Sequence, residues 1–142
     1  MFGRPSAMSP ADGLAHGILF LMKHIISSIL YLIALLCLSV FVFDPTNLYY
    51  ELEWLDIPMH IMGGFGVASL ALSIASYRKQ KIYFIPVFLI YIAVATGWEF
   101  YELAQDLLTS SPWNGWSDTV SDMFNGALGT AVAYYYFYLF KK

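Results

Sequence analysis

Four long runs of apolar residues, separated by short polar stretches, make up most of the chain. They are Ile25–Phe43, Ile57–Ser76, Ile82–Trp98 with a continuation to about Leu108, and Thr119–Phe140. Each approaches the roughly 20 apolar residues that a helix needs to cross a bilayer. The first run carries no charge, and the other three carry their polar residues near one end. The pattern predicts transmembrane helices at about residues 18–43, 56–77, 81–108 and 118–140, after an N-terminal arm over residues 1–16.

Short connections between the predicted helices favour an all-α, up-down bundle, because consecutive helices then become antiparallel neighbours. The length of 142 residues suggests a single domain, 1–142. Small residues on the second and fourth runs predict close helix packing, since lipid supplies no hydrophobic drive for helix association. They are Gly63, Gly64, Gly66, Ala68 and Ser69 on the second run, and Gly126, Ala127, Gly129 and Ala131 on the fourth.

The composition agrees with a membrane protein. Hydrophobic residues make up 59% of the chain and charged residues 12%, with a mean hydropathy of +0.62. Soluble proteins carry about a quarter of charged residues, so an ordinary soluble domain is excluded. No basic groove or interleaved basic and aromatic pattern indicates a nucleic-acid partner. The expected surroundings are a lipid bilayer, and the sequence leaves homo-oligomerisation open.

The charged residues are sorted by side. With four spans, all seven lysines and arginines fall on one side of the membrane, and of the ten acids only Asp12 lies with them. Loops rich in lysine and arginine normally face the cytoplasm. We therefore expect both termini in the cytoplasm and the remaining acids toward the outer face. Trp54, Trp98, Trp113 and Trp116 would lie near the outer interface, where an aromatic belt explains them.

Polar side chains recur at helical spacing in the outer part of three predicted helices. They form the sets Asp56/His60, Glu99/Glu102 and Asp118/Asp122/Asn125. Residues three or four apart share a helix face, and a rise of about 1.5 Å per residue puts His60 about 6 Å inward of Asp56. A charged group in a bilayer costs several kcal/mol unless it faces the bundle interior or water. The three sets are therefore expected to converge in one shallow outer layer.

Because no lysine or arginine is predicted on this side, the cluster must be partly protonated, well hydrated or occupied by a cation. Carboxylates with an imidazole suit a divalent ion such as Mg, Mn, Zn or Fe. The candidate metal ligands are His60, Glu99, Glu102, Asp122 and Asp56. Asp56 and Asp118 fit equally well as acids at helix N-termini, where the helix dipole favours them. Asp106 fits an interfacial position.

The ordered motifs resemble a known family. Asp56-x-x-x-His60, Glu99-x-x-Glu102 and Asp122-x-x-Asn125-Gly126-Ala127-x-Gly129 are similar to the pattern of VanZ-like membrane proteins, and WEFYE and DTVSD resemble YjdF-type inner-membrane proteins. VanZ-like members commonly have glutamine at the position of Glu102, and an arginine before the last helix where this chain has SSPWNGWS. The resemblance implies a bacterial inner-membrane protein of the cell envelope, linked for the namesake to glycopeptide-antibiotic resistance.

Three functions fit these residues. The first is a metal-dependent enzyme acting on a lipid or lipid-linked precursor at the outer leaflet, with Glu99, Glu102, Asp118 and Asn125 as candidate catalytic residues. Glu102 or Asp118 would act as general base, and Asn125 would orient substrate or a ligand. The second is a noncatalytic envelope-stress or antibiotic-resistance accessory protein. The third is a transporter of protons or divalent cations. The sequence ranks the enzyme first but leaves open whether the protein is one.

Overall fold

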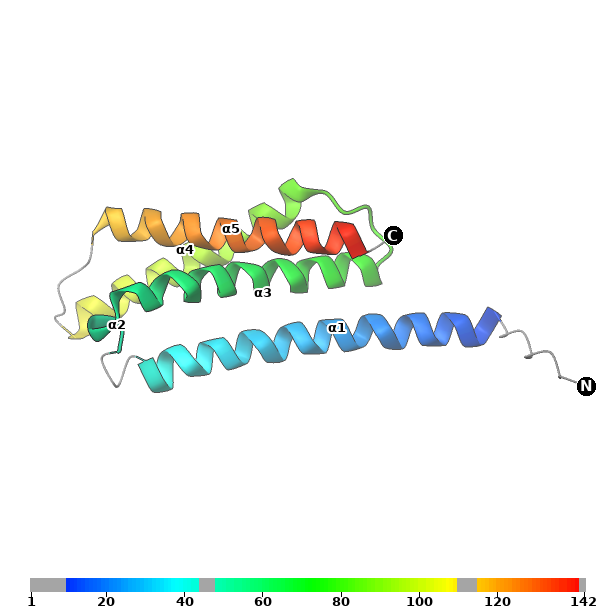
Figure 1. The fold of residues 1–142 in the computed structure, drawn as a ribbon, viewed down its shortest axis with the longest axis horizontal. Coiled ribbons are helices and arrows are strands. Elements are labelled where there is room, and N and C mark those ends of the chain that lie inside the picture. Colours follow the sequence, from blue (N-terminus) through cyan, green and yellow to red (C-terminus); the bar gives the residue numbers. More distant parts are fainter. Residues whose placement is uncertain (1–9, 44–47, 110–114, 141–142) are drawn as a thin grey trace, which may run out of the picture.

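The described residues, 10–43, 48–109 and 115–140 of the computed structural model, form only helical elements and connecting turns. In chain order these are α1 (Pro10–Leu38), a π-helical turn η1 (Ser39–Phe43), α2 (Leu48–Glu51), a 3₁₀ turn η2 (Glu53–Leu55), α3 (Asp56–Tyr77), α4 (Phe84–Thr109) and α5 (Trp116–Phe140). The prediction of an all-α fold is confirmed. The helices α1, α3, α4 and α5 alternate in direction, so α1 starts and α5 ends at the same end of the molecule (Figure 1).

Within the described ranges, three helical segments are long and apolar enough to cross a membrane: Gly17–Phe43, Asp56–Tyr77 and Phe84–Leu108. The helix α5 has a similar length but is less apolar. It carries Asp118, Asp122 and Asn125 in its first half and several tyrosines in its second half. Large apolar side chains point outward from the bundle, among them Leu30 and Leu107, as expected of a surface that faces lipid.

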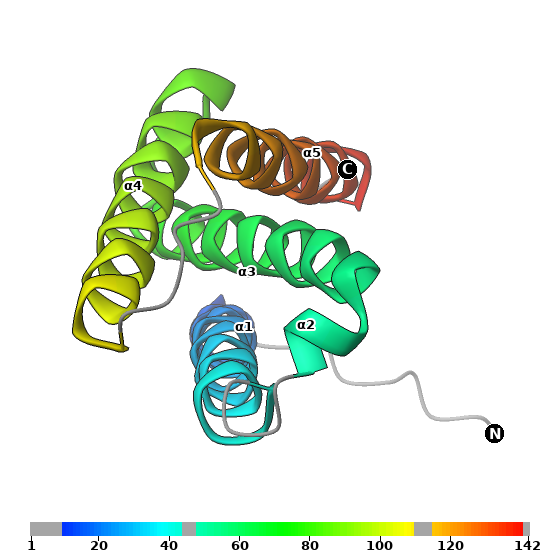
Figure 2. The ribbon, with the colours of Figure 1, turned by 90° about the vertical axis from the view of Figure 1, so that its left-hand side faces the viewer.

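The helix α3 lies at the centre of the arrangement. Viewed along the bundle, it is flanked by α1 on one side and α5 on the other, with α4 beside both α3 and α5 (Figure 2). Its most extensive contact is with α5, and it also contacts α1 and α4. Among the described elements, α1 packs against α3 without a comparable contact to α4 or α5. The chain therefore forms a three-helix unit of α3, α4 and α5, with α1 laid along α3.

Glycine allows α3 and α5 to touch backbone to backbone. A Cβ atom at Gly64 would overlap the backbone of Gly126, and one at Gly129 would overlap the backbone of Ile61 and Phe65. The hydroxyl of Thr130 donates a hydrogen bond of 3.2 Å to the carbonyl of Gly64 across this contact. The expected packing of the second and fourth apolar runs through these glycines is thus observed.

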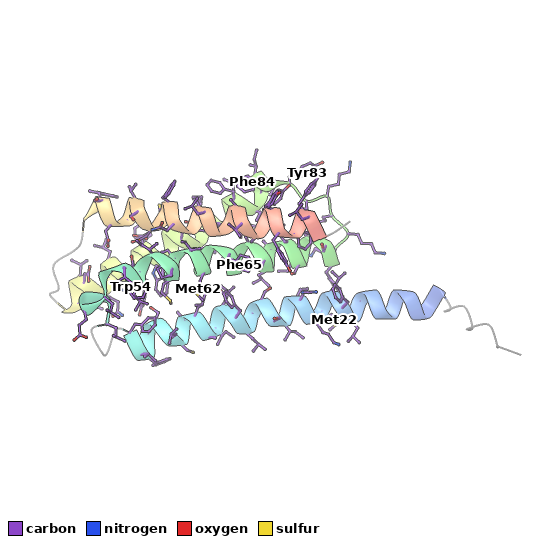
Figure 3. The ribbon with its side chains drawn as sticks, viewed as in Figure 1. Met22, Trp54, Met62, Phe65, Tyr83 and Phe84 are labelled. Atoms are coloured by element: carbon purple, nitrogen blue, oxygen red, sulfur yellow. The ribbon has the colours of Figure 1, made fainter. Side chains whose placement is uncertain are left out.

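The end of the bundle opposite the polar residues is packed with apolar side chains. Ala68, Leu72, Val87 and Ala133 are buried there, with Phe65, Ile82 and Tyr134 packed against them. Figure 3 shows Tyr83 and Phe84 toward this end and Trp54 toward the other. The turn after α3, which carries Arg78, Lys79 and Lys81, lies beyond the packed end.

Three helix starts differ from the sequence expectation, the smallest difference being that of α5, which begins at Trp116 instead of about residue 118. The arm expected over residues 1–16 is helical from Pro10 onward, since proline fits the first turn of a helix; residues 1–9 lie outside the described part. The third predicted helix starts at Phe84 instead of about residue 81. Pro86 explains this start, because the ring of a proline clashes with the carbonyl four residues earlier, here that of Ile82, in a continuous helix.

Candidate functional site

Polar side chains of three helices meet at the end of the bundle that carries Trp54. The start of α3 supplies Asp56 and His60, the second half of α4 supplies Glu99 and Glu102, and the start of α5 supplies Asp122. These elements meet because α3 enters this end as α4 leaves it, and because the glycine contact draws α5 against α3. The predicted convergence of the three helix faces is present for these five residues.

His60 connects α3 to α5. Its Nε2 atom lies 3.2 Å from Oδ1 of Asp56, one turn earlier in the same helix. The same atom lies 3.7 Å from Oδ1 of Asp122 on α5. The side chain of Asp122 is almost fully buried, whereas that of Asp56 is partly exposed. The imidazole therefore bridges a carboxylate at the rim and a carboxylate inside the bundle.

Two groups of side chains have the spacing of metal ligands. In each of Asp56/His60/Asp122 and Glu99/Glu102/Asp122, one donor atom per residue lies within 4.8 Å of the others. Donors that share one ion at about 2.0–2.6 Å from it lie up to about 4–5 Å apart. Either group could hold a divalent ion. Asp122 belongs to both groups, so the two positions are adjacent.

Glu102 is held by a neighbour on its own helix. The indole Nε1 of Trp98, one turn earlier on α4, donates a hydrogen bond of 2.5 Å to Oε1 of Glu102. Trp98 was expected in an aromatic belt together with Trp54 and Trp116, but only those two are largely exposed at 62% and 75%. Trp113 lies outside the described residues. Trp98 is thus a site residue that the sequence analysis missed; its spacing of four residues from Glu102 is the signal that could have found it.

Two predicted catalytic residues lie apart from these groups. Asn125 is buried on α5, and its amide donates to the hydroxyl of Ser121 at 3.4 Å. Asp118 lies in the first turn of α5, where an acid interacts favourably with the helix dipole. Neither residue lines the cavity described next. The geometry favours the helix-terminus interpretation for Asp118 and a role inside α5 for Asn125.

A cavity of about 200 Å³ lies against the cluster. The helices α3, α4 and α5 supply its polar lining, which includes His60, Glu99, Glu102 and Asp122, while α1 supplies an apolar wall from Leu32 to Leu36. Within the described residues no lysine or arginine lines it. Apart from His60 and Tyr91, the ionisable side chains that line it are acids, an environment suited to a cation.

Tyr91 closes the cavity on the side of the packed end. Its ring is buried, and its hydroxyl donates a hydrogen bond of 2.5 Å to the backbone carbonyl of Met123 on α5. A Cβ atom at Gly126 would come too close to the same ring. Tyr91 therefore ties α4 to α5 directly below Asp122, and this residue too was not singled out from the sequence.

A family model described as "Predicted membrane protein (DUF2238)" matches residues 13–142, which is nearly the whole chain. The chain belongs to this family. No curated protein and no solved structure matches it. Membership of DUF2238 agrees with the long apolar helices and supports a location in a lipid bilayer. The finer likeness to VanZ-like and YjdF-type proteins stays a prediction from the motifs.

Proposed function

We propose that this protein is a metal-dependent enzyme of the bacterial cell envelope that acts on a lipid or lipid-linked precursor at the outer leaflet of the inner membrane. The observation that carries the proposal is the pair of ligand groups sharing Asp122 beside a cavity whose ionisable lining is acidic apart from His60 and Tyr91. Ionisable residues inside membrane helices are rare and usually mark function. The VanZ-like resemblance points to the same compartment.

The proposed topology has four spans, with both termini in the cytoplasm. The alternating direction of α1, α3, α4 and α5 supports it, as does the basic turn of Arg78, Lys79 and Lys81 at the end opposite the cluster. In this arrangement α5 crosses the membrane with Asp122 and Asn125 buried in the bundle, which offsets its lower hydropathy. The cluster then faces the extracytoplasmic side.

The donor set fits Mg, Mn, Zn or Fe. A carboxylate-rich site is typical of Mg and Mn, while the imidazole of His60 also suits Zn and Fe. A divalent ion at this place would activate a bound water for attack on an ester or phosphoester. A carboxylate of the cluster that does not bind the ion would accept the proton.

The packing at the opposite end of the bundle favours an enzyme over a transporter. A permeation path would have to pass Leu72, Val87 and Ala133, which are buried against one another. An accessory or binding protein remains the second candidate, because the His60 contacts also connect α3 with α5. In that case the polar cluster would serve helix packing.

Elemental analysis of detergent-purified protein tests the proposal. We expect about one divalent ion per chain in the wild type and its loss in the double variant His60→Ala/Glu99→Gln, because metal sites depend on ligand number. The matched control is Asp106→Asn, which removes a carboxylate from α4 outside both ligand groups and should keep the ion. A wild type without metal at micromolar concentrations of each ion contradicts the proposal.

Folded yield separates the enzyme from the accessory alternative. For a metal enzyme, Glu102→Gln should leave the monodisperse yield near that of Asp106→Asn while metal content falls. A cluster that only holds helices together predicts the reverse, namely reduced yield in Glu102→Gln and no ion in any variant.

A further inference from the structure

The cavity beside the ligand groups has half-exposed lining residues on two helices. Leu36 on α1 and Val94 on α4 line it, yet their side chains are 49% and 50% exposed. A residue that lines a cavity and is also half exposed stands at its rim. The helices α1 and α4 do not pack extensively against each other, since each packs mainly on α3 or α5. Both belong to segments apolar enough to span a membrane, so in the proposed topology the opening faces hydrocarbon.

From this geometry we infer that the ligand of the site is a lipid phosphate, which enters from the bilayer between α1 and α4 and keeps its chain there while its phosphate reaches the cluster. The inference rests on the proposed function, because an ion held by the carboxylates is what would bind the phosphate. Divalent ions such as Mg²⁺ bind substrate phosphates directly, and no lysine or arginine among the described lining residues offers another anion contact.

The size of the cavity supports a ligand that stays mostly outside. Pockets that enclose a small molecule have volumes of about 300–1,000 Å³, whereas this cavity has about 200 Å³. It has room for a headgroup and an ion but not for a whole lipid. The remainder of the ligand must therefore extend through the opening into the hydrocarbon of the bilayer.

The two walls of the cavity match the two parts of such a molecule. The α1 wall is apolar at Leu32, Leu35 and Leu36, while the facing walls carry His60, Glu99 and Asp122. A fully polar substrate would leave the leucine wall without a partner, and a hydrocarbon alone would leave the carboxylates without one. An amphiphile satisfies both walls at once.

Gly63 provides the room between these walls. It lies on α3 one turn from His60 and lines the cavity, and no atom lies within 4 Å of the position that a Cβ would take. A side chain there would occupy the cavity without meeting backbone. Gly97 is the matched control, because it is also a helical glycine with nothing within 4 Å, but it lies on the exposed face of α4 outside the cavity lining.

Native mass spectrometry of metal-loaded protein with added lipid tests the inference. The probes are phosphatidylglycerol, a polyprenyl phosphate and diacylglycerol, and the last of these lacks phosphate. We expect wild type and Gly97→Leu to retain one phosphate-bearing lipid, and Gly63→Leu to bind it at least tenfold more weakly. Diacylglycerol should show no retained adduct. The better-retained of the two phosphate lipids identifies which source the site uses.

Equal lipid retention by Gly63→Leu and Gly97→Leu overturns the inference, and so does equal retention of diacylglycerol. If Gly63→Leu does not yield folded protein, Leu36→Trp at the rim replaces it, with the outward-facing Leu30→Trp as its control. Metal content of the same samples separates the two proposals. Gly63→Leu with bound ion and unchanged lipid retention removes the lipid inference alone, whereas wild type without ion removes the proposed function.

Discussion

At the scale of single residues, Trp98 shows that a tryptophan expected at the membrane interface can instead contact a residue of the candidate site. Trp98 and Trp116 both lie where interfacial tryptophans are expected. Only the indole of Trp98 turns inward and donates to Glu102. The hydrogen bond orients one carboxylate oxygen and leaves the other for an ion or a proton.

Replacing Trp98 by phenylalanine tests this role, because the change keeps the ring but removes the N–H group. We expect Trp98→Phe to weaken metal binding by about tenfold to a hundredfold, as is typical when a partner of a metal ligand is lost. The measurement is a titration of the metal-free protein with Mn²⁺ or Zn²⁺. Trp116→Phe, at a largely exposed position, should bind as the wild type does. Equal affinities in the two variants would show that the indole does not position Glu102.

The sequence predicted five members of the cluster, Asp56, His60, Glu99, Glu102 and Asp122, from spacing and depth. Spacing shows which residues share a helix face, and the cost of charge in lipid turns that face inward. Sequence spacing does not give the rotation of each helix about its axis. Asn125 lies one turn beyond Asp122, yet its amide points back to Ser121. The direction of this amide depends on how α5 packs against its neighbours, and the local sequence pattern does not determine that packing.

At the scale of helices, the contact between α3 and α5 depends on two glycines that face backbone. The helix ends followed from hydropathy, whereas the start of α4 needed Pro86 as well, and the glycine pattern predicted which helices approach closely. Both Gly63 and Gly64 line the cavity, and the pattern did not show that a side chain at Gly63 would meet open space whereas one at Gly64 would overlap the backbone of Gly126. Adjacent helical positions differ by about 100° around the axis, so this distinction needs the packed structure.

This difference makes a paired substitution informative. We expect Gly64→Ala to lower the free energy of unfolding by about 1–3 kcal/mol, because the added methyl group overlaps the backbone of Gly126. Gly63→Ala meets open space and should raise it slightly, by up to about 0.5–1 kcal/mol, since alanine favours a helix more than glycine does. Denaturation in mixed detergent and SDS micelles measures both. An unchanged free energy of unfolding in Gly64→Ala would mean that α3 and α5 can move apart at this contact without loss of stability.

At the scale of the whole molecule, the proposed four-span topology can be tested by labelling. In a Cys37→Ser background, a cysteine at Gly115 should react with a membrane-impermeant maleimide in intact cells, because the start of α5 is expected outside. A cysteine at Gln80, in the basic turn after α3, should react only after the inner membrane is permeabilised. Labelling of Gln80→Cys alone from outside would mean that the protein has the opposite orientation, and labelling of both positions from outside would show that α4, the helix between them, does not cross the membrane.

The contact between Gly64 and Thr130 also determines when the protein can be assembled. The two residues are 66 positions apart, and α4 is made between them. At a synthesis rate of about 5–20 residues per second, about 3–13 s separate the emergence of the two partners. During that interval Asp56 and His60 have no α5 to cover them, and their exposure to lipid is unfavourable. In the proposed topology α3 therefore lacks its contact with α5 during insertion, and a chain that ends before α5 should be less stable in the membrane than the full chain.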